Sequence, residues 1–212
     1  MSVNLQTPVR SEYFMMFAFP PLYVVEYPHD LSAIQEAVDD LEFRQSQSNF
    51  TTSNQYILEL ESLSKLKEFC LFSVQKYTAD VILNPHHEIG IQQSWANKTV
   101  KGTEHPKHYH LNSMISGVFY VRSSDDAPPI VFDSVRQDPF PVRPEPDRSL
   151  PSNEFTNDSY TFKASAGHLL LFPSILHHYV PMHTGDEPRI SISFNTFPML
   201  PVGSYDASTL LT

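Results

Sequence analysis

The sequence changes in texture after Pro85, and this change constrains the fold more than any other feature. From there on, short segments rich in β-branched and aromatic residues are separated by turn residues: 88–97, 113–123, 128–134, 159–165, 167–174, 177–182 and 188–197. Strands at this spacing, with no helical segments between them, favour a sandwich or barrel over a parallel sheet. We therefore predict a mainly β protein with two packed sheets.

The N-terminal part of the sequence has a different pattern. Apolar residues recur at helical spacing in residues 29–43, with Asp30 as the expected N-cap, and again in residues 62–83, where Pro85 ends the helix. We read residues 11–27 as one or two strands and the polar run 44–55 as a loop. The prediction is a single domain over residues 1–212. About 1–85 form N-terminal strands and two helices packed on a β core of about 86–200.

Charge and composition exclude several classes of partner. The net charge is −10, which argues against nucleic acid, since phosphate contacts need clustered Lys and Arg. No stretch is apolar enough for a membrane span or a secretory signal, so we expect a cytoplasmic protein.

The single cysteine, Cys70, lies in a helical pattern and is expected to be a buried thiol. The proline-rich residues 135–157 are expected to form a long loop.

Histidines cluster immediately before one of the predicted strands, in the segment HPKHYH. In a strand, residues i and i+2 point to the same face, so His108 and His110 would project toward one point. Imidazole is a preferred ligand of Fe, Zn, Cu and Ni. Two alternatives remain open here: His105 could replace His108, or the frame could shift to His110 and Asn112.

A second cluster supports a metal site. In the segment FPSILHHYVPMHTGDEPRISISFN, His178 precedes Arg189, and Arg189 begins an alternating strand. A third imidazole on a neighbouring strand would complete a facial set of three ligands, which suits non-haem Fe(II) oxygen chemistry. A buried arginine is costly unless it meets an anion, and Arg189 and Ser191 share one face of the strand. This pair is suited to clamping a carboxylate.

These motifs, HYH, SGVFYV, GHLLLFPSILHHYVP and RISISFN, together resemble the core of the 2-oxoglutarate- and Fe(II)-dependent oxygenases. The similarity covers roughly residues 91–197 and is closest to a group of short, largely uncharacterised oxygenases of bacteria and phages. The resemblance implies a double-stranded β-helix (jelly roll, cupin-like). It also implies Fe(II) as the metal, 2-oxoglutarate as co-substrate and O2 as oxidant.

The resemblance also assigns residues, with no catalytic residue beyond the metal ligands. The metal ligands fall on His108, His110 and His178, with His178 preferred to its neighbour His177. The co-substrate motif falls on Arg189 and Ser191, and Tyr120 matches a strand tyrosine that hydrogen-bonds the same carboxylate in prolyl-hydroxylase-like members. His110 stands where the superfamily usually has a carboxylate, although three-histidine iron sites occur in related cupin-type dioxygenases.

We therefore expect a dioxygenase, a hydroxylase of unidentified substrate, that releases succinate and CO2. The substrate is a small molecule or a protein side chain, and a homodimer is compatible with the sequence. One alternative is a cupin-type metal-dependent dioxygenase or isomerase that uses no 2-oxoglutarate and has no need for Arg189. The other is a barrel that serves as a binding module without catalysis. We read Trp95 and Asn97, which share one strand face, as core residues.

Overall fold

A computed structural model describes residues 21–84, 88–133, 147, 149–151, 159–163 and 165–199. The predicted loop at 135–157 falls almost wholly outside these residues, as does the first part of the strand region predicted at 11–27. None of the helices in the described part is long and apolar enough to cross a membrane.

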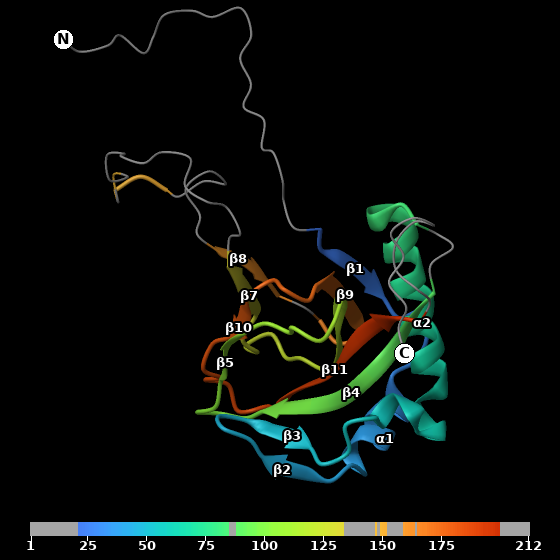
Figure 1. The fold of residues 1–212 in the computed structure, drawn as a ribbon. Coiled ribbons are helices and arrows are strands. Elements are labelled where there is room, and N and C mark those ends of the chain that lie inside the picture. Colours follow the sequence, from blue (N-terminus) through green and yellow to red (C-terminus); the bar gives the residue numbers. More distant parts are fainter. Residues whose placement is uncertain are drawn as a thin grey trace, which may run out of the picture.

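The larger of two antiparallel sheets runs through the middle of the described structure (Figure 1). Its strands lie in the order β1 (Tyr23–Glu26), β9 (His168–Pro173), β6 (Ile115–Arg122), β11 (Arg189–Pro198), β4 (Ile89–Thr99), β3 (Phe50–Thr52) and β2 (Phe43–Gln45). The smaller sheet has the order β5 (His105–His108), β10 (His178–Val180), β7 (Ile130–Asp133) and β8 (Ser159–Phe162).

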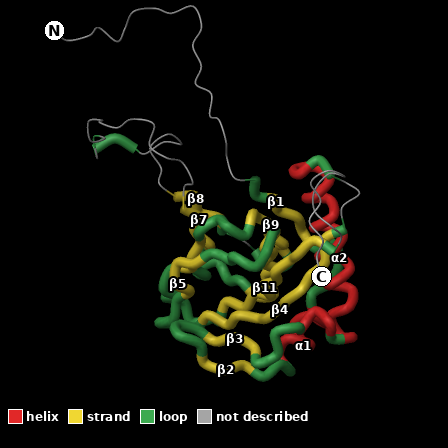
Figure 2. The backbone as a smooth tube through the Cα atoms, in the orientation of Figure 1, coloured by secondary structure: helices red, strands yellow, loops and turns green. Residues whose placement is uncertain are grey.

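The helices cover one face of the large sheet, and the small sheet lies on the other side (Figures 1 and 2). Both α-helices, α1 (Ser32–Asp39) and α2 (Ser64–Tyr77), follow predicted segments, and α2 continues into one π-helical turn, η3 (Thr78–Ile82). Two short 3-10 helices, η1 (Ile57–Glu59) and η2 (Glu61–Leu63), precede α2.

Side chains of β11 alternate between the two faces of the large sheet, and this alternation separates the helical layer from the layer of the small sheet. Ile190, Ile192 and Phe194 join the hydrophobic cluster that contains buried residues of both α-helices, whereas Ser191 and Ser193 point to the opposite face. On that opposite face, a second cluster combines residues of β6, β7 and β9. Two antiparallel sheets packed face to face in this way form the double-stranded β-helix, or jelly roll, so the predicted fold class is confirmed.

Three local predictions were wrong. Residues 44–55 are not simply a loop, because β2 and β3 form a hairpin that extends the large sheet through the pairing of Phe50 with Lys98. The helical period of residues 62–83 predicts Phe72 on or near the apolar face of α2, but its side chain is 69% exposed. Helix α1 begins one residue later than predicted, with Leu31 as N-cap, although the carboxylate of Asp30 accepts a hydrogen bond from the Ser32 amide.

Candidate functional site

Three histidines from different segments converge between the two sheets. Strands β5 and β10 pair so that His108 lies opposite His178, and the ring centroids of these residues are 4.3 Å apart. The ring of His110 lies 5.0 Å from that of His108 and 5.4 Å from that of His178. One nitrogen from each imidazole lies within 4.8 Å of the others, so the three could share one metal ion.

His110 does not lie on the strand where we predicted it. We predicted that His108 and His110 share the face of a strand, but β5 ends at His108. The chain turns there, and the amide of His110 donates a hydrogen bond to the carbonyl oxygen of Ser174, 2.9 Å away. His110 therefore reaches the cluster from a loop held against the segment that precedes β10, and not through strand alternation.

Backbone carbonyls fix the orientation of two of these imidazoles. Nδ1 of His108 lies 2.8 Å from the carbonyl oxygen of Pro106, and Nδ1 of His178 lies 2.8 Å from that of Leu176. A carbonyl oxygen only accepts, so each Nδ1 carries the proton and each Nε2 keeps its lone pair. Such hydrogen bonds on the far ring nitrogen are usual for metal-binding histidines.

Burial keeps all of these imidazoles uncharged at neutral pH. Loss of hydration, reinforced by the neighbouring imidazoles, lowers the pKa of His178 to about 3 and that of His110 to about 4. Burial also lowers the pKa of His108, although the Pro106 carbonyl opposes the shift. Neutral imidazole is the form that binds metals.

A fourth histidine, His105, lines the same cavity without joining the ligand cluster. Its ring stacks on that of His108 with centroids 4.5 Å apart and planes at 11°. The side-chain amide of Asn49 donates to its Nδ1 across 3.4 Å. Burial, with contributions from His108 and Arg189, lowers the pKa of His105 to about 4. Of His105 and His108, the two residues considered for the first metal ligand, the geometry favours His108.

Arg189 lies buried at the start of β11, 3% exposed. Its guanidinium packs 4.8 Å from the ring centroid of Tyr120 and is 3.5 Å from the hydroxyl of Ser191. Ser191 pairs with Tyr120 across β11 and β6, so the three residues predicted to bind the co-substrate do lie together. Among the described residues, no carboxylate forms an ion pair with Arg189.

Unpaired polar atoms surround this arginine. Within the described residues, three buried side-chain atoms have no hydrogen-bond partner: Nε of Arg189, the hydroxyl of Tyr120 and the hydroxyl of Thr99. Thr99 pairs with Arg189 across β4 and β11. Burial raises the pKa of Tyr120 although the neighbouring Arg189 guanidinium opposes the shift, so the hydroxyl keeps its proton and can donate. Buried polar groups without hydrogen-bond partners cost free energy. A carboxylate bound beside Arg189 would accept hydrogen bonds from the guanidinium and from these hydroxyl groups, so the arrangement fits such a ligand.

Sequence reasoning missed several residues of this cavity. Trp95 and Asn97, which we had read as core, line it together with His105 and Ser193, and the indole of Trp95 lies 6.0 Å from the ring of His110. Trp95, Asn97 and Thr99 follow each other at alternate positions of β4. Since residues i and i+2 of a strand share a face, the pair Trp95 and Asn97 already indicated that Thr99 lies on the same face.

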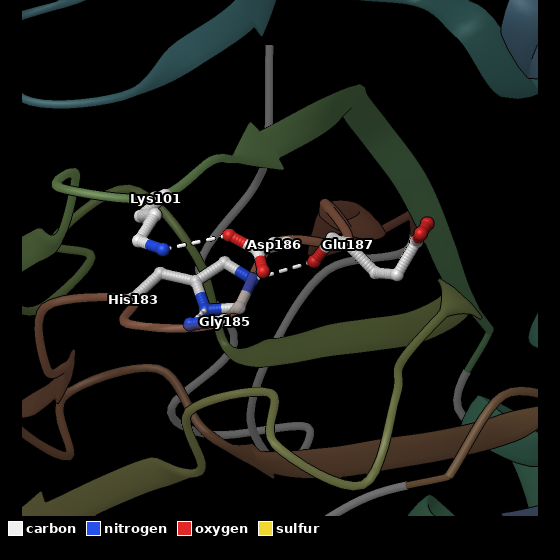
Figure 3. A network of polar contacts seen from close by, with 5 residues as sticks. All are labelled: Lys101, His183, Gly185, Asp186 and Glu187. Atoms are coloured by element: carbon white, nitrogen blue, oxygen red, sulfur yellow. Dashed lines mark hydrogen bonds and ion pairs between the residues drawn. The ribbon is translucent and has the colours of Figure 1, made fainter.

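The loop that leads into Arg189 is organised by a histidine that belongs to no metal cluster in the described residues (Figure 3). His183 is completely buried. Its Nε2 donates to the carbonyl oxygen of Glu187 across 2.7 Å, and its Nδ1 accepts from the amide of Gly185 across 3.2 Å. On the outside, Lys101 and Asp186 form an ion pair of 2.6 Å. These bonds hold the turn from which β11 begins.

Comparison with known proteins places these features in context. Residues 93–195 match the model of a family described as "Putative 2OG-Fe(II) oxygenase", and this span contains His105, His108, His110, His178 and Arg189. No curated protein sequence matches the chain.

Solved structures of low sequence identity share the fold. One is a 2OG-Fe(II) oxygenase family oxidoreductase from Burkholderia pseudomallei (12% identity, TM-score 0.58, covering 82% of this chain and 83% of that one). Another is HygX from Streptomyces hygroscopicus with nickel, 2-oxoglutarate and hygromycin B bound (10%, TM-score 0.62, 85% and 84%). A third is a prolyl-4-hydroxylase from Pseudomonas putida (10%, TM-score 0.52, 83% and 92%).

Proposed function

Because residues 93–195 match a family of 2OG-Fe(II) oxygenases and solved oxygenases share the fold, we propose that the chain is a 2-oxoglutarate- and Fe(II)-dependent oxygenase. In this proposal it binds Fe(II) through His108, His110 and His178 and hydroxylates a substrate. The observation that carries the proposal is the convergence of three neutral imidazoles in a cavity that also contains a buried arginine with no ion-pair partner among the described residues. A structural role for the histidines alone would not explain the unpaired arginine.

The arginine is proposed to hold the co-substrate. The planar fork of Arg189 can donate two parallel hydrogen bonds to the distal carboxylate of 2-oxoglutarate. The hydroxyl of Ser191 and the ring of Tyr120 lie beside the guanidinium, and the hydroxyl groups of both residues can donate to the same carboxylate. Binding would satisfy the buried atoms that have no hydrogen-bond partner within the described part of the chain.

Iron held by the three histidines, together with 2-oxoglutarate, would supply oxidative chemistry in which one oxygen atom of O2 enters a substrate C–H bond and the other enters 2-oxoglutarate, which would leave as succinate and CO2. The residues of this chain prepare that chemistry. Carbonyl oxygens of Pro106 and Leu176 hold His108 and His178 with their Nε2 atoms toward the cluster. The ring of Phe172, 4.8 Å from that of His178, shields the site from water.

The remaining expectations about partners belong to the same proposal. O2 is the oxidant, the substrate is a small molecule or a protein side chain, and the enzyme acts in the cytoplasm. Sedimentation equilibrium of the purified chain would test whether it forms a homodimer.

The deciding experiment is an anaerobic titration of the protein with Fe(II) and 2-oxoglutarate, followed through the visible charge-transfer band of the chelate. The parent should develop this band at one iron per chain. Because three ligands share one site, replacing His108, His110 or His178 by Ala should weaken iron binding by about tenfold or more. His177→Ala, an exposed neighbour outside the cluster, is the matched control and should bind as the parent does.

Three outcomes would contradict the assignment. If His105→Ala loses iron while His110→Ala keeps it, the ligand set is wrong. If iron binds but 2-oxoglutarate gives no chelate band, the cupin-type alternative replaces this one. A chain that binds neither would be the non-catalytic module.

A further inference from the structure

The cavity around the proposed metal site has no negative charge among its described residues. Its ionisable lining consists of Arg189, Tyr179 and four histidines, and includes no aspartate or glutamate. The electrostatic influences on His105 come from His108, His110 and Arg189, and not from a carboxylate. This contrasts with the chain as a whole, whose net charge is −10.

If the proposed function holds, this lining leaves a charge uncompensated. Fe(II) carries two positive charges, and 2-oxoglutarate brings two negative ones. Three neutral histidines add none, and Arg189 adds one positive charge. A carboxylate in place of His110 would cancel it. A buried charge without a counter-charge is costly, so the loaded site favours a further anion.

His105 has the geometry to receive that anion. Since Asn49 donates to its Nδ1, the proton of the neutral ring lies on Nε2. Among the described residues, this Nε2 has no hydrogen-bond partner, and the ring lines the cavity while stacking on His108. The Nε2–H group of His105 is therefore a hydrogen-bond donor without a described partner. It lies beside the proposed metal ligand His108, where the loaded site has an excess of positive charge.

We propose that the substrate presents an oxyanion, a carboxylate or a phosphate, to this cavity and that His105 donates to it through Nε2. The inference rests on the proposed function and narrows its substrate class. His105 acts as a substrate-binding residue and not as a metal ligand, and Asn49 sets the ring nitrogen that donates.

The test uses the full chain loaded with Zn(II) and 2-oxoglutarate, which cannot turn over. Acetate and methylphosphonate are titrated separately by calorimetry at low ionic strength, one probe for each source of the oxyanion. At least one should bind. His105→Phe keeps the stacked ring but has no donor, so it should weaken that binding by about tenfold or more. His177→Phe makes the same change outside the cavity and should bind the probe as the parent does.

A second variant tests the charge argument separately. His110→Asp restores a carboxylate to the metal site, so its loaded form should also bind the probe more weakly than the parent. In the parent, the side-chain 15N–1H spectrum of His105 should shift at Nε2 on adding the probe.

The outcomes separate the two proposals. A parent that forms the 2-oxoglutarate complex but binds neither probe, or binds one equally well after His105→Phe, overturns this inference alone. Failure to form the 2-oxoglutarate complex, with the His105-dependent binding of a probe intact in the metal-loaded protein, overturns the proposed co-substrate and keeps the anion site.

Discussion

At the scale of single residues, Arg189 carries a buried charge that no described carboxylate balances. Removing one partner of a buried charge pair typically costs about 3–5 kcal/mol, so Arg189→Ala should nearly abolish 2-oxoglutarate binding. Arg189→Lys keeps the charge but loses the planar fork and should bind with intermediate affinity. Calorimetry on the metal-loaded protein measures both, and unchanged affinity in Arg189→Ala would refute the proposed role.

The cavity histidines make the stability of the metal-free protein depend on pH. In the unfolded chain they bind protons below an ordinary pKa of 6.5, whereas the pKa values of His105 and His110 in the fold are about 4. The unfolded state therefore binds more protons in this window. The free energy of unfolding should fall as the pH drops from 6.5 toward about 4.

Urea unfolding in the presence of a chelator, at about pH 7 and about pH 5, measures this loss. The variant His105→Phe removes one of the contributing groups, so its stability should change less between the two pH values than that of the parent. Equal sensitivity in both proteins would show that His105 does not contribute.

At the scale of elements, β6 and β11 pack so closely that Gly117 has no room for a side chain. It pairs with Phe194, and a Cβ at residue 117 would overlap the phenyl ring. Gly117→Ala should therefore destabilise the protein by about 1–3 kcal/mol. Adding Phe194→Leu should recover part of that loss, because the smaller side chain makes room. A double-mutant cycle from urea unfolding tests the coupling, and strictly additive effects would contradict it.

At the scale of the whole molecule, we predict that residues 1–212 fold as one domain. One hydrophobic cluster contains Ile34 and Val38 of α1, Leu66 and Val74 of α2, and residues of the large sheet. Elements that share a core unfold together in small proteins. Trp95 is the only tryptophan and reports on the sheet by fluorescence, while far-UV circular dichroism reports on the helices. The two unfolding curves should coincide, and separate midpoints would indicate two units.

The sequence by itself determined the fold class, both helices and the strands that carry Tyr120, His178 and Arg189. These predictions depend on local patterns: a helical period of apolar residues, alternation in strands, and turn residues between them. Long periodic segments and motif residues within strands can therefore be recognised in the sequence. The hairpin of β2 and β3 was missed because its short, polar strands gain their stability from pairing with β4, which is distant in the sequence.

The tertiary structure alone decided which residues meet. The sequence favoured His108 as the first ligand but left His105 open as an alternative, and the pairing of β5 with β10 is what places His108 opposite His178. His110 reaches the cluster through a loop bonded to Ser174, and Thr99 becomes part of the site because β4 sets it beside Arg189. Contacts between residues far apart in the chain follow from register and packing, which local sequence patterns do not encode.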